Sequence, residues 1–419
     1  MHSVAPGAAL LLAHVRDRGA LTAARALRSA GWRVDAGSPR ADGGLLGASR
    51  AVGTVHVVPR PTGDRDAFVA AVERAHSRGG YDVVFGSGDD WMAATAYLQD
   101  RLPVRVAHPS PDVVSRVLDK LEMARLAADV GLAAPWTASA AAVSVEDSPL
   151  PVVVKNRWHW VPGRRRRHRV ETRICRTRED LREHLDGFSH DGDEPVLQEH
   201  IEGRLGALIG VMHEGRLLGR VQQVSPRLWP TPTGASARAC TVPVDPDLAD
   251  RSVRFLRRLG WTGLVELQFL IDDDGVHHLI DVNGRFFGSL ALSESARPGL
   301  VDAWARSVIG APVPDLGDGQ AGLRYHWLPG DLRRAATERR GGLAHDVWDS
   351  MRWGLGARHS VARLNDPQPA LHLLAGRWAA RGDSTEPTEP GPHPRERSLE
   401  MTSSATRRSG ARSTTRVSW

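Results

Sequence analysis

The clearest structural signal in this sequence is "GLVELQFLIDDDGVHHLIDVNGRFFGS", Gly263–Ser289. Two apolar runs stand on either side of a polar turn, Asp272–Gly275, and this pattern predicts a β-hairpin. Each predicted strand carries two oxygen-bearing side chains that are two residues apart, and such residues share one face of a strand. The two pairs are Glu266 with Gln268 and Asp281 with Asn283. We therefore expect four polar side chains to project from paired strands into one space.

These residue types suit a magnesium–phosphate site. Mg²⁺ prefers oxygen ligands and usually binds one or two protein groups together with substrate phosphates. Arg285 follows directly and has the forked guanidinium that recognises phosphate. A plainer interpretation remains open, in which Asp281 and Asn283 only cap a turn before Gly284. Glu266 fits a surface position as well as a metal neighbour.

Lysine is scarce in this chain. The 55 basic residues include only two lysines, Lys120 and Lys155, so arginine is the general surface cation. A lysine in such a background indicates a need for a compact ammonium on a flexible stem. Lys155 ends an apolar run, "PVVVKN", where an unpaired ammonium would be costly. We expect both lysines to contact phosphate, although Lys120 also fits a solvated helix position.

The bulk composition limits the class of protein. A chain of 419 residues with 41% hydrophobic residues is expected to form two or three domains. No apolar run reaches the roughly 20 residues of a membrane span, no secretory leader is recognisable, and two cysteines build no disulfide framework. A cytoplasmic protein is expected. The net charge of +6 reflects the bias towards arginine, so neither nucleic acid nor membrane is expected as a partner.

The rest of the chain divides into several parts. From Ala8 to Val117, short apolar runs alternate with helical patterns, which predicts a doubly wound parallel sheet without a dinucleotide fingerprint. Further on, we expect a helix from Asp119 to Gly131, a hairpin over Leu205–Val224, a long loop over Ser225–Asp245 and a helix over Pro246–Leu259. Helical pieces follow, and the polar end of the chain is expected to be disordered.

Taken in order, six motifs resemble the ATP-grasp superfamily. They are "LDK", "GLAAP", "VVVK", "VLQEHIEG", "VELQF" and "LIDVNGRFFGS". "NGRFFGS" and "PTPTGAS" are most similar to a branch of predicted ATP-dependent carboxylate–amine ligases, and the "LQF" strand resembles the ATP-binding core of carbamoyl-phosphate synthetases. The resemblance implies α/β and α+β parts: a Rossmann-like pre-grasp domain (1–117), a two-lobed ATP-grasp core (118–312), a helical C-terminal extension (313–381) and a disordered tail (382–419).

The resemblance also implies roles for individual residues. Lys120 and Lys155 would bind ATP phosphates, and Lys155 and Arg285 would be catalytic. The nucleotide would be lined by Gln198, Glu199, His200, Ile201 and Glu202. Mg²⁺, or Mn²⁺ in its place, would be held by Gln268, Asp281, Asn283 and Glu266. The substrate loop would contain Arg227, Gly234 and Ser236. Apart from the resemblance, the arginines Arg164–Arg167 fit closure over ATP or recognition of an acidic substrate, and they fit an exposed charged loop equally well.

The implied activity is ATP-dependent ligation of a carboxylate to an amine through an acyl phosphate, with small-molecule substrates and a possible homodimer. An ATP-binding pseudo-ligase with a regulatory or scaffold role is the alternative. Two departures from the family pattern favour it. Gln268 replaces a metal-binding carboxylate, and Leu205 stands where a ribose-binding Glu is usual.

Overall fold

The computed structural model describes residues 7–61, 63–158, 172–188 and 194–379, with side chains as far as residue 375. Its first part is a five-stranded parallel sheet in the order β3-β2-β1-β4-β5. The strands are β1 (Ala8–Leu12), β2 (Arg33–Ser38), β3 (Val55–Val57), β4 (Val83–Gly86) and β5 (Arg105–Val106). The main helices are α1 (Arg18–Ser29), α2 (Gly44–Gly47), α3 (Arg65–Gly79), α4 (Asp89–Tyr97) and α5 (Pro111–Leu118). The predicted parallel sheet is confirmed, whereas α5 was not predicted.

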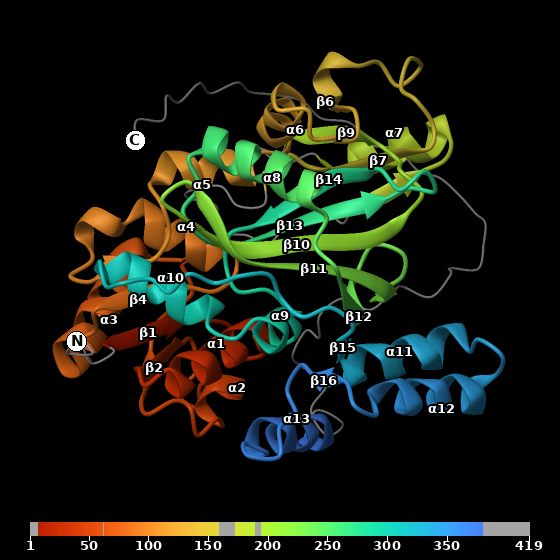
Figure 1. Ribbon diagram of the computed structural model, residues 1–419. Helices are drawn as coiled ribbons and strands as arrows, with labels where there is room; N and C mark the ends of the chain where they lie inside the picture. Colours follow the sequence, from red (N-terminus) through yellow and green to blue (C-terminus); the bar gives the residue numbers. More distant parts are fainter. Residues whose placement is uncertain (1–6, 62, 159–171, 189–193, 380–419) are drawn as a thin grey trace, which may run out of the picture. The chain divides into compact units, whose positions relative to one another are not determined.

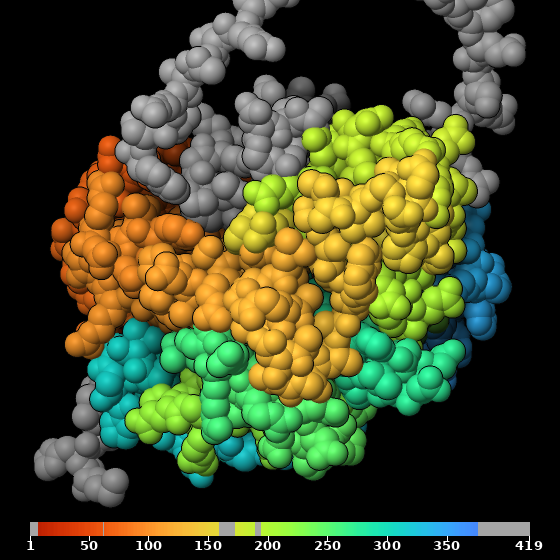
Figure 2. Space-filling model, turned by 90° about the horizontal axis from the view of Figure 1, so that it is seen from above, coloured from red at the N-terminus to blue at the C-terminus, as the bar shows by residue number. Residues whose placement is uncertain are grey.

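A small antiparallel sheet forms the second part, in the order β6-β9-β7-β8. The strands are β6 (Thr137–Ser139), β7 (Val152–Asn156), β8 (Arg173–Cys175) and β9 (Pro195–Glu199), and the helices are α6 (Lys120–Asp129) and α7 (Arg178–Asp186). Val152, Val154 and Leu197 are buried in the core of this small lobe. Figure 2 shows the lobe, gold to yellow-green, beside the orange helices of the first part.

The third part is a seven-stranded sheet in the order β14-β13-β10-β11-β12-β15-β16. Its strands are β10 (Arg204–His213), β11 (Arg216–Trp229), β12 (Ala235–Val242), β13 (Gly263–Ile271), β14 (His277–Asn283), β15 (Arg324–His326) and β16 (Arg358–His359). Helix α8 (Pro246–Leu259) covers one face, where Val265, Leu267 and Phe269 are buried with it (Figure 1). The predicted hairpins and α8 are confirmed.

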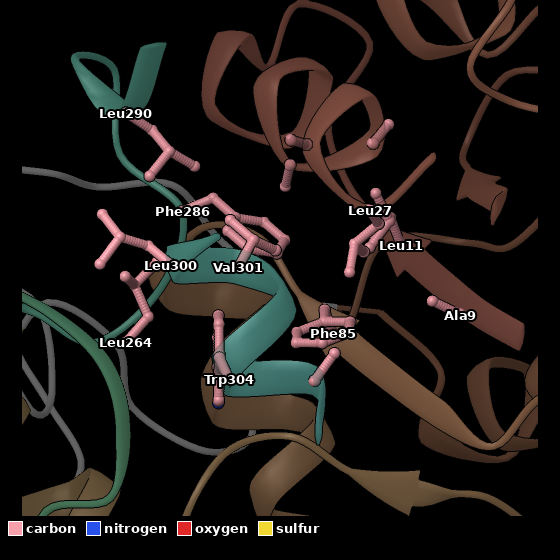
Figure 3. Close-up of a cluster of buried hydrophobic side chains, with 14 of the residues drawn as sticks. Ala9, Leu11, Leu27, Phe85, Leu264, Phe286, Leu290, Leu300, Val301 and Trp304 are labelled. Atoms are coloured by element: carbon pink, nitrogen blue, oxygen red, sulfur yellow. The ribbon is translucent and has the colours of Figure 1, made fainter. Parts of the chain in front are cut away.

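The opposite face of the large sheet packs towards the first sheet through α9 (Leu290–Ala296) and α10 (Leu300–Ile309). Trp304 of α10 makes edge-on contacts with Phe85 of β4, at 4.7 Å between ring centroids, and with Phe286, at 5.4 Å (Figure 3). Leu264 of β13 belongs to the same core. Because Phe286 is buried in this core, the loop that follows β14 is held in place between the two sheets.

The predicted loop over Ser225–Asp245 was wrong. Strand β11 runs on to Trp229 and β12 begins at Ala235, so only residues 230–234 connect them. The segment contains Arg238, a poor candidate for a buried strand position, yet Arg238 is buried and bound to Asp331 at 2.7 Å. Its partner lies 93 residues further along the chain, so no local pattern indicated the strand.

The C-terminal extension contains α11 (Leu328–Glu338), α12 (Leu343–Gly354) and α13 (Gln368–Ala379), in addition to β15 and β16. The helical prediction is confirmed, and the two strands are an addition. A buried ion pair at 2.8 Å joins Asp366 to Arg25 of α1 and anchors the extension to the first part of the chain. The tail and Arg164–Arg167 lie outside the described residues. In the described part of the chain, no helix has the length and hydropathy of a membrane span.

Candidate functional site

The site is built on the hairpin of β13 and β14. Gln268 lies opposite Asp281 and Glu266 lies opposite Asn283, so the two predicted pairs face one another across the antiparallel strands. Alternate residues of β13, such as Leu267, are buried on the face covered by α8. The polar residues therefore occupy the other face, as their spacing predicted.

Glu266 is the buried centre of this cluster. Only 2% of the residue is exposed, and its Oε2 accepts hydrogen bonds from Asn283 Nδ2 at 2.8 Å and from Gln268 Nε2 at 3.0 Å. Ser289 Oγ donates to the other carboxylate oxygen at 3.3 Å. Burial raises the pKa of Glu266 above its usual value, and these hydrogen bonds oppose the rise. Glu266 thus lies beneath the two amides rather than at the surface.

Lys120 reaches the hairpin from the first residue of α6. Its side chain is 1% exposed, and its Nζ donates to Asp281 Oδ1 at 2.5 Å. Asp119 caps the same helix by accepting from the backbone of Leu121 and Glu122. Asp119 also binds Arg157, which follows β7, at 2.6 and 2.9 Å. The "LDK" motif therefore fixes a cation against the hairpin and ties α6 to the strand that carries Lys155.

Lys155 enters the site from the small lobe. Its Nζ donates to Gln198 Oε1 at 2.8 Å, and Gln198 in turn donates to Thr137 Oγ1 at 2.9 Å. Part of the residue is accessible, yet burial is the main cause that lowers the pKa of Lys155 to about 7. The positive charge of Lys120 lowers it further and Asp281 raises it. The two lysines and Asp281 therefore lie within electrostatic reach of one another.

Arg285 follows β14 and contacts the first part of the chain. Its Nε donates to Asp89 Oδ1 at 2.9 Å, and its Nη1 donates to Phe286 O at 3.1 Å. Burial works against the guanidinium charge, but the nearby Asp89 carboxylate raises the pKa of Arg285 above its usual range. A permanent cation is thus held beside the hairpin.

The "VLQEHIEG" residues connect the small lobe to the large sheet. Gln198 and Glu199 end β9, and β10 begins at Arg204, so His200, Ile201 and Glu202 form the connection. Glu199 is exposed, and the backbones of Glu199 and Trp136 are joined by a hydrogen bond of 2.8 Å. Gln198 turns its side chain to Lys155, which the sequence did not indicate.

Three predicted substrate residues are placed in or next to β11 and β12. Arg227 is paired with Asp349 at 2.7 Å and Asp346 at 3.4 Å. Burial lowers the pKa of Arg227, and the positive charges of Arg238 and Arg334 act in the same direction. Ser236 Oγ lies 2.7 Å from Ser225 Oγ, and Gly234 precedes β12. These residues thus contact the C-terminal extension and their own sheet. These contacts include neither Lys120 nor Lys155.

Sequence reasoning missed Asp119, Asp89 and Ser289. Asp119 had a signal, because an aspartate before a helical pattern is a typical N-cap. No local sequence pattern marks Asp89 or Ser289. The partner of Asp89 is Arg285, which is 196 residues away in the sequence, and the partner of Ser289 is Glu266 on β13.

The oxygen-bearing residues fit a magnesium ion that also binds phosphates. Among the residues that the structure describes, no group of three or more His, Cys, Asp and Glu side chains forms a metal site. The polar face of strands β13 and β14 instead offers one accessible carboxylate, Asp281, and the amides of Gln268 and Asn283. Mg²⁺ uses few protein ligands when phosphates supply the others. The two lysines and Arg285 provide the cations that a polyphosphate needs.

No protein-family model matches the sequence, and no curated protein is similar enough to count as a relative. Many solved structures share its architecture, and three of them illustrate the range. The L-amino acid ligase from Bacillus licheniformis is 15% identical, with a TM-score of 0.56 over 73% of this chain and 74% of that one. The biotin carboxylase–β,γ-ATP complex from Campylobacter jejuni is 16% identical, with a TM-score of 0.59 over 75% and 74%. The N5-carboxyaminoimidazole synthetase from Staphylococcus aureus, complexed with ADP, is 12% identical, with a TM-score of 0.58 over 76% and 80%.

The chain therefore shares the overall fold of these three proteins.

Proposed function

We propose that this protein is an ATP-dependent ligase that joins a carboxylic acid to an amine. The observation that carries the proposal is the convergence of Lys120, Lys155 and Asp281 from three separate elements. The residues present suit ATP with Mg²⁺, and the biotin carboxylase and synthetase structures named above contain ATP or ADP. The connection from Glu199 to Glu202 would then line the nucleotide between the lobes.

The chain's own residues would act mainly by holding charge in place. Lys120 and Lys155 would bind the phosphates of ATP, and Arg285 would stabilise the phosphoryl group as it is transferred. Asp281, Gln268 and Asn283 would hold Mg²⁺, which neutralises phosphate charge when bound. Lys155 would take up a proton as the phosphates approach, because only part of its amine is protonated near neutral pH.

The proposed reaction has two steps. A carboxylate oxygen of the acid attacks the γ-phosphorus of ATP, the bond to the β-phosphate oxygen breaks and ADP leaves. The amine nitrogen then attacks the acyl carbon, inorganic phosphate leaves and the nitrogen loses a proton. Exclusion of water by the small lobe would protect the acyl phosphate from hydrolysis.

Trapping with hydroxylamine tests the proposal. The protein is incubated with ATP, Mg²⁺, hydroxylamine and pools of amino acids and other small carboxylic acids, and hydroxamate and ADP are measured. We expect both products from at least one pool, and loss of both in Lys155→Met. Nucleotide binding without ADP release in any pool would instead favour the pseudo-ligase, and absence of nucleotide binding would refute both.

A further inference from the structure

Glu266 is the one carboxylate of the hairpin that lies beneath the site. Its Oε2 accepts hydrogen bonds from both hairpin amides, Asn283 at 2.8 Å and Gln268 at 3.0 Å. With 2% of the residue exposed, Glu266 is far more buried than its neighbour Asp281, whose side chain is 22% exposed. The two carboxylates within strands β13 and β14 therefore have different surroundings.

The orientation of the two amides follows from these bonds. An amide side chain has a donating NH₂ group on one side and an accepting oxygen on the other. Because Asn283 and Gln268 both direct their NH₂ groups to Glu266, their carbonyl oxygens are turned away from it. A side chain at position 266 that could donate as well as accept would leave either amide free to flip and present an NH₂ group, which repels a cation.

Glu266 is itself held in place by a hydrogen bond from the loop after β14, and that loop is held by β11. Ser289 Oγ donates to Glu266 Oε1 at 3.3 Å, and Gln223 Nε2 of β11 donates to Ser289 Oγ at 2.9 Å. Gln223 is also buried, with 2% of the residue exposed. A continuous chain of hydrogen bonds thus runs from β11 through the loop after β14 to the hairpin.

We propose that Glu266 is a positioning residue that holds the carbonyl oxygens of Asn283 and Gln268 ready to bind Mg²⁺, without binding the metal itself. This inference rests on the proposed function. This role explains why an amide can stand at position 268. A negative charge of the site is carried by Glu266, which lies behind the amides of Gln268 and Asn283 and orients both of them. Groups behind metal ligands typically change metal affinity by about 10–100-fold.

A titration with Mn²⁺ in the presence of ADP tests this role without requiring turnover. Electron paramagnetic resonance of the free ion measures how much Mn²⁺ is bound. We expect Glu266→Gln to weaken Mn²⁺ binding by about tenfold or more, while ADP binding without metal is unchanged. Glu294→Gln is the matched control, because Glu294 is a buried glutamate whose hydrogen-bond donors, among the described residues, are the backbone groups of Gly299 and Val301. It should bind Mn²⁺ like the wild type. Unfolding temperatures without metal show that each variant is folded.

The Asn283→Asp background separates positioning from direct ligation. This substitution places a second carboxylate, with an oxygen on both sides, against Glu266, and the two negative charges would repel one another. The amide that Glu266→Gln introduces can instead donate to that carboxylate. Because a carboxylate at position 283 needs no orientation, adding Glu266→Gln to Asn283→Asp should lower Mn²⁺ affinity much less than Glu266→Gln does alone. An equal loss in both backgrounds would show that Glu266 acts on the metal directly and overturn the inference, as would unchanged affinity of Glu266→Gln alone. A wild type that binds no Mn²⁺–ADP would refute the proposed function as well.

Discussion

Lys120 and Lys155 each place a compact ammonium in the site, and Lys155 also shows the second property that separates lysine from arginine, a pKa that responds to its surroundings. Arginine supplies the permanent charges of the site, as at Arg285 beside Asp89. Lys155 has a pKa of about 7 because it is buried near Lys120. The scarcity of lysine predicted that both residues have special surroundings. The sequence did not indicate the lowered pKa of Lys155, because burial and a nearby charge are properties of the folded chain.

Proton uptake on nucleotide binding follows from the lowered pKa of Lys155. At about pH 8, the free protein carries mostly neutral Lys155, and bound phosphates favour its charged form. We expect the affinity for Mg–ADP to fall as pH rises above about 7, and binding to take up protons. Titration calorimetry in two buffers with different ionisation enthalpies measures this uptake. Lys155→Met should lose it, and equal uptake by wild type and variant would contradict this assignment.

The same pKa has a consequence for folding. The pKa of Lys155 is lower in the folded chain than its ordinary value near 10.5, so the unfolded chain binds more protons. The free-energy cost of holding protonated Lys155 in the folded chain is fully present below about pH 7. This cost falls as pH rises towards about 10. The free energy of unfolding of the wild type should therefore rise relative to that of Lys155→Met over this interval. Denaturant titrations of both proteins at several pH values check this, and parallel pH profiles would contradict it.

At the scale of elements, the hairpin shows what a local pattern can determine. The hairpin and the shared face of its polar residues followed from apolar runs, a polar turn and period-two spacing. The pairing of Gln268 with Asp281 did not, because it depends on a shift of register between Gln268 and Phe269. Strands β11 and β12 show the limit, because the partly buried Arg227 and the buried Arg238 pair there with carboxylates of the C-terminal extension. A loop was predicted because those partners are distant in the sequence.

The ion pair of Asp119 and Arg157 joins two elements of the site, α6 and the segment after β7. Arg157→Met should weaken Mg–ADP binding several-fold, because Lys120 and Lys155 would no longer be held at a fixed separation. Arg125→Met is the matched control, since Arg125 lies on the same helix as Lys120 and its ion pairs are with Glu122 and Asp129 of that helix. Calorimetric titration compares the two variants. Equal affinities in both would show that the pair is structural only.

At the scale of the whole molecule, the C-terminal extension holds distant parts of the chain together. It adds β15 and β16 to the large sheet and reaches α1 through Arg25 and Asp366, whose side chains are each 5% exposed. Its helical character was predictable from composition. Its contacts were not, because a buried arginine in the sequence resembles an exposed one until its partner is known.

Removal of one partner from this pair should destabilise the whole fold. Asp366→Ala leaves the Arg25 charge buried and also removes the hydrogen bonds of Asp366 with Ser49 and Arg50. We expect a loss of about 3–5 kcal/mol in the free energy of unfolding. Asp66→Ala, which removes the exposed partner of Arg101, should change stability little. Chemical denaturation measures both, and a small effect of Asp366→Ala would show that the pair is dispensable.

The proposed function requires that two lysines and the hairpin bind one magnesium-bound polyphosphate. Titration calorimetry of a non-hydrolysable ATP analogue with Mg²⁺ tests it most directly, using the wild type, Lys120→Met and Lys155→Met. Saturable binding by the wild type and at least about tenfold weaker binding by each variant is the expected result. No binding by the wild type, or equal affinity in all three proteins, would contradict the claim.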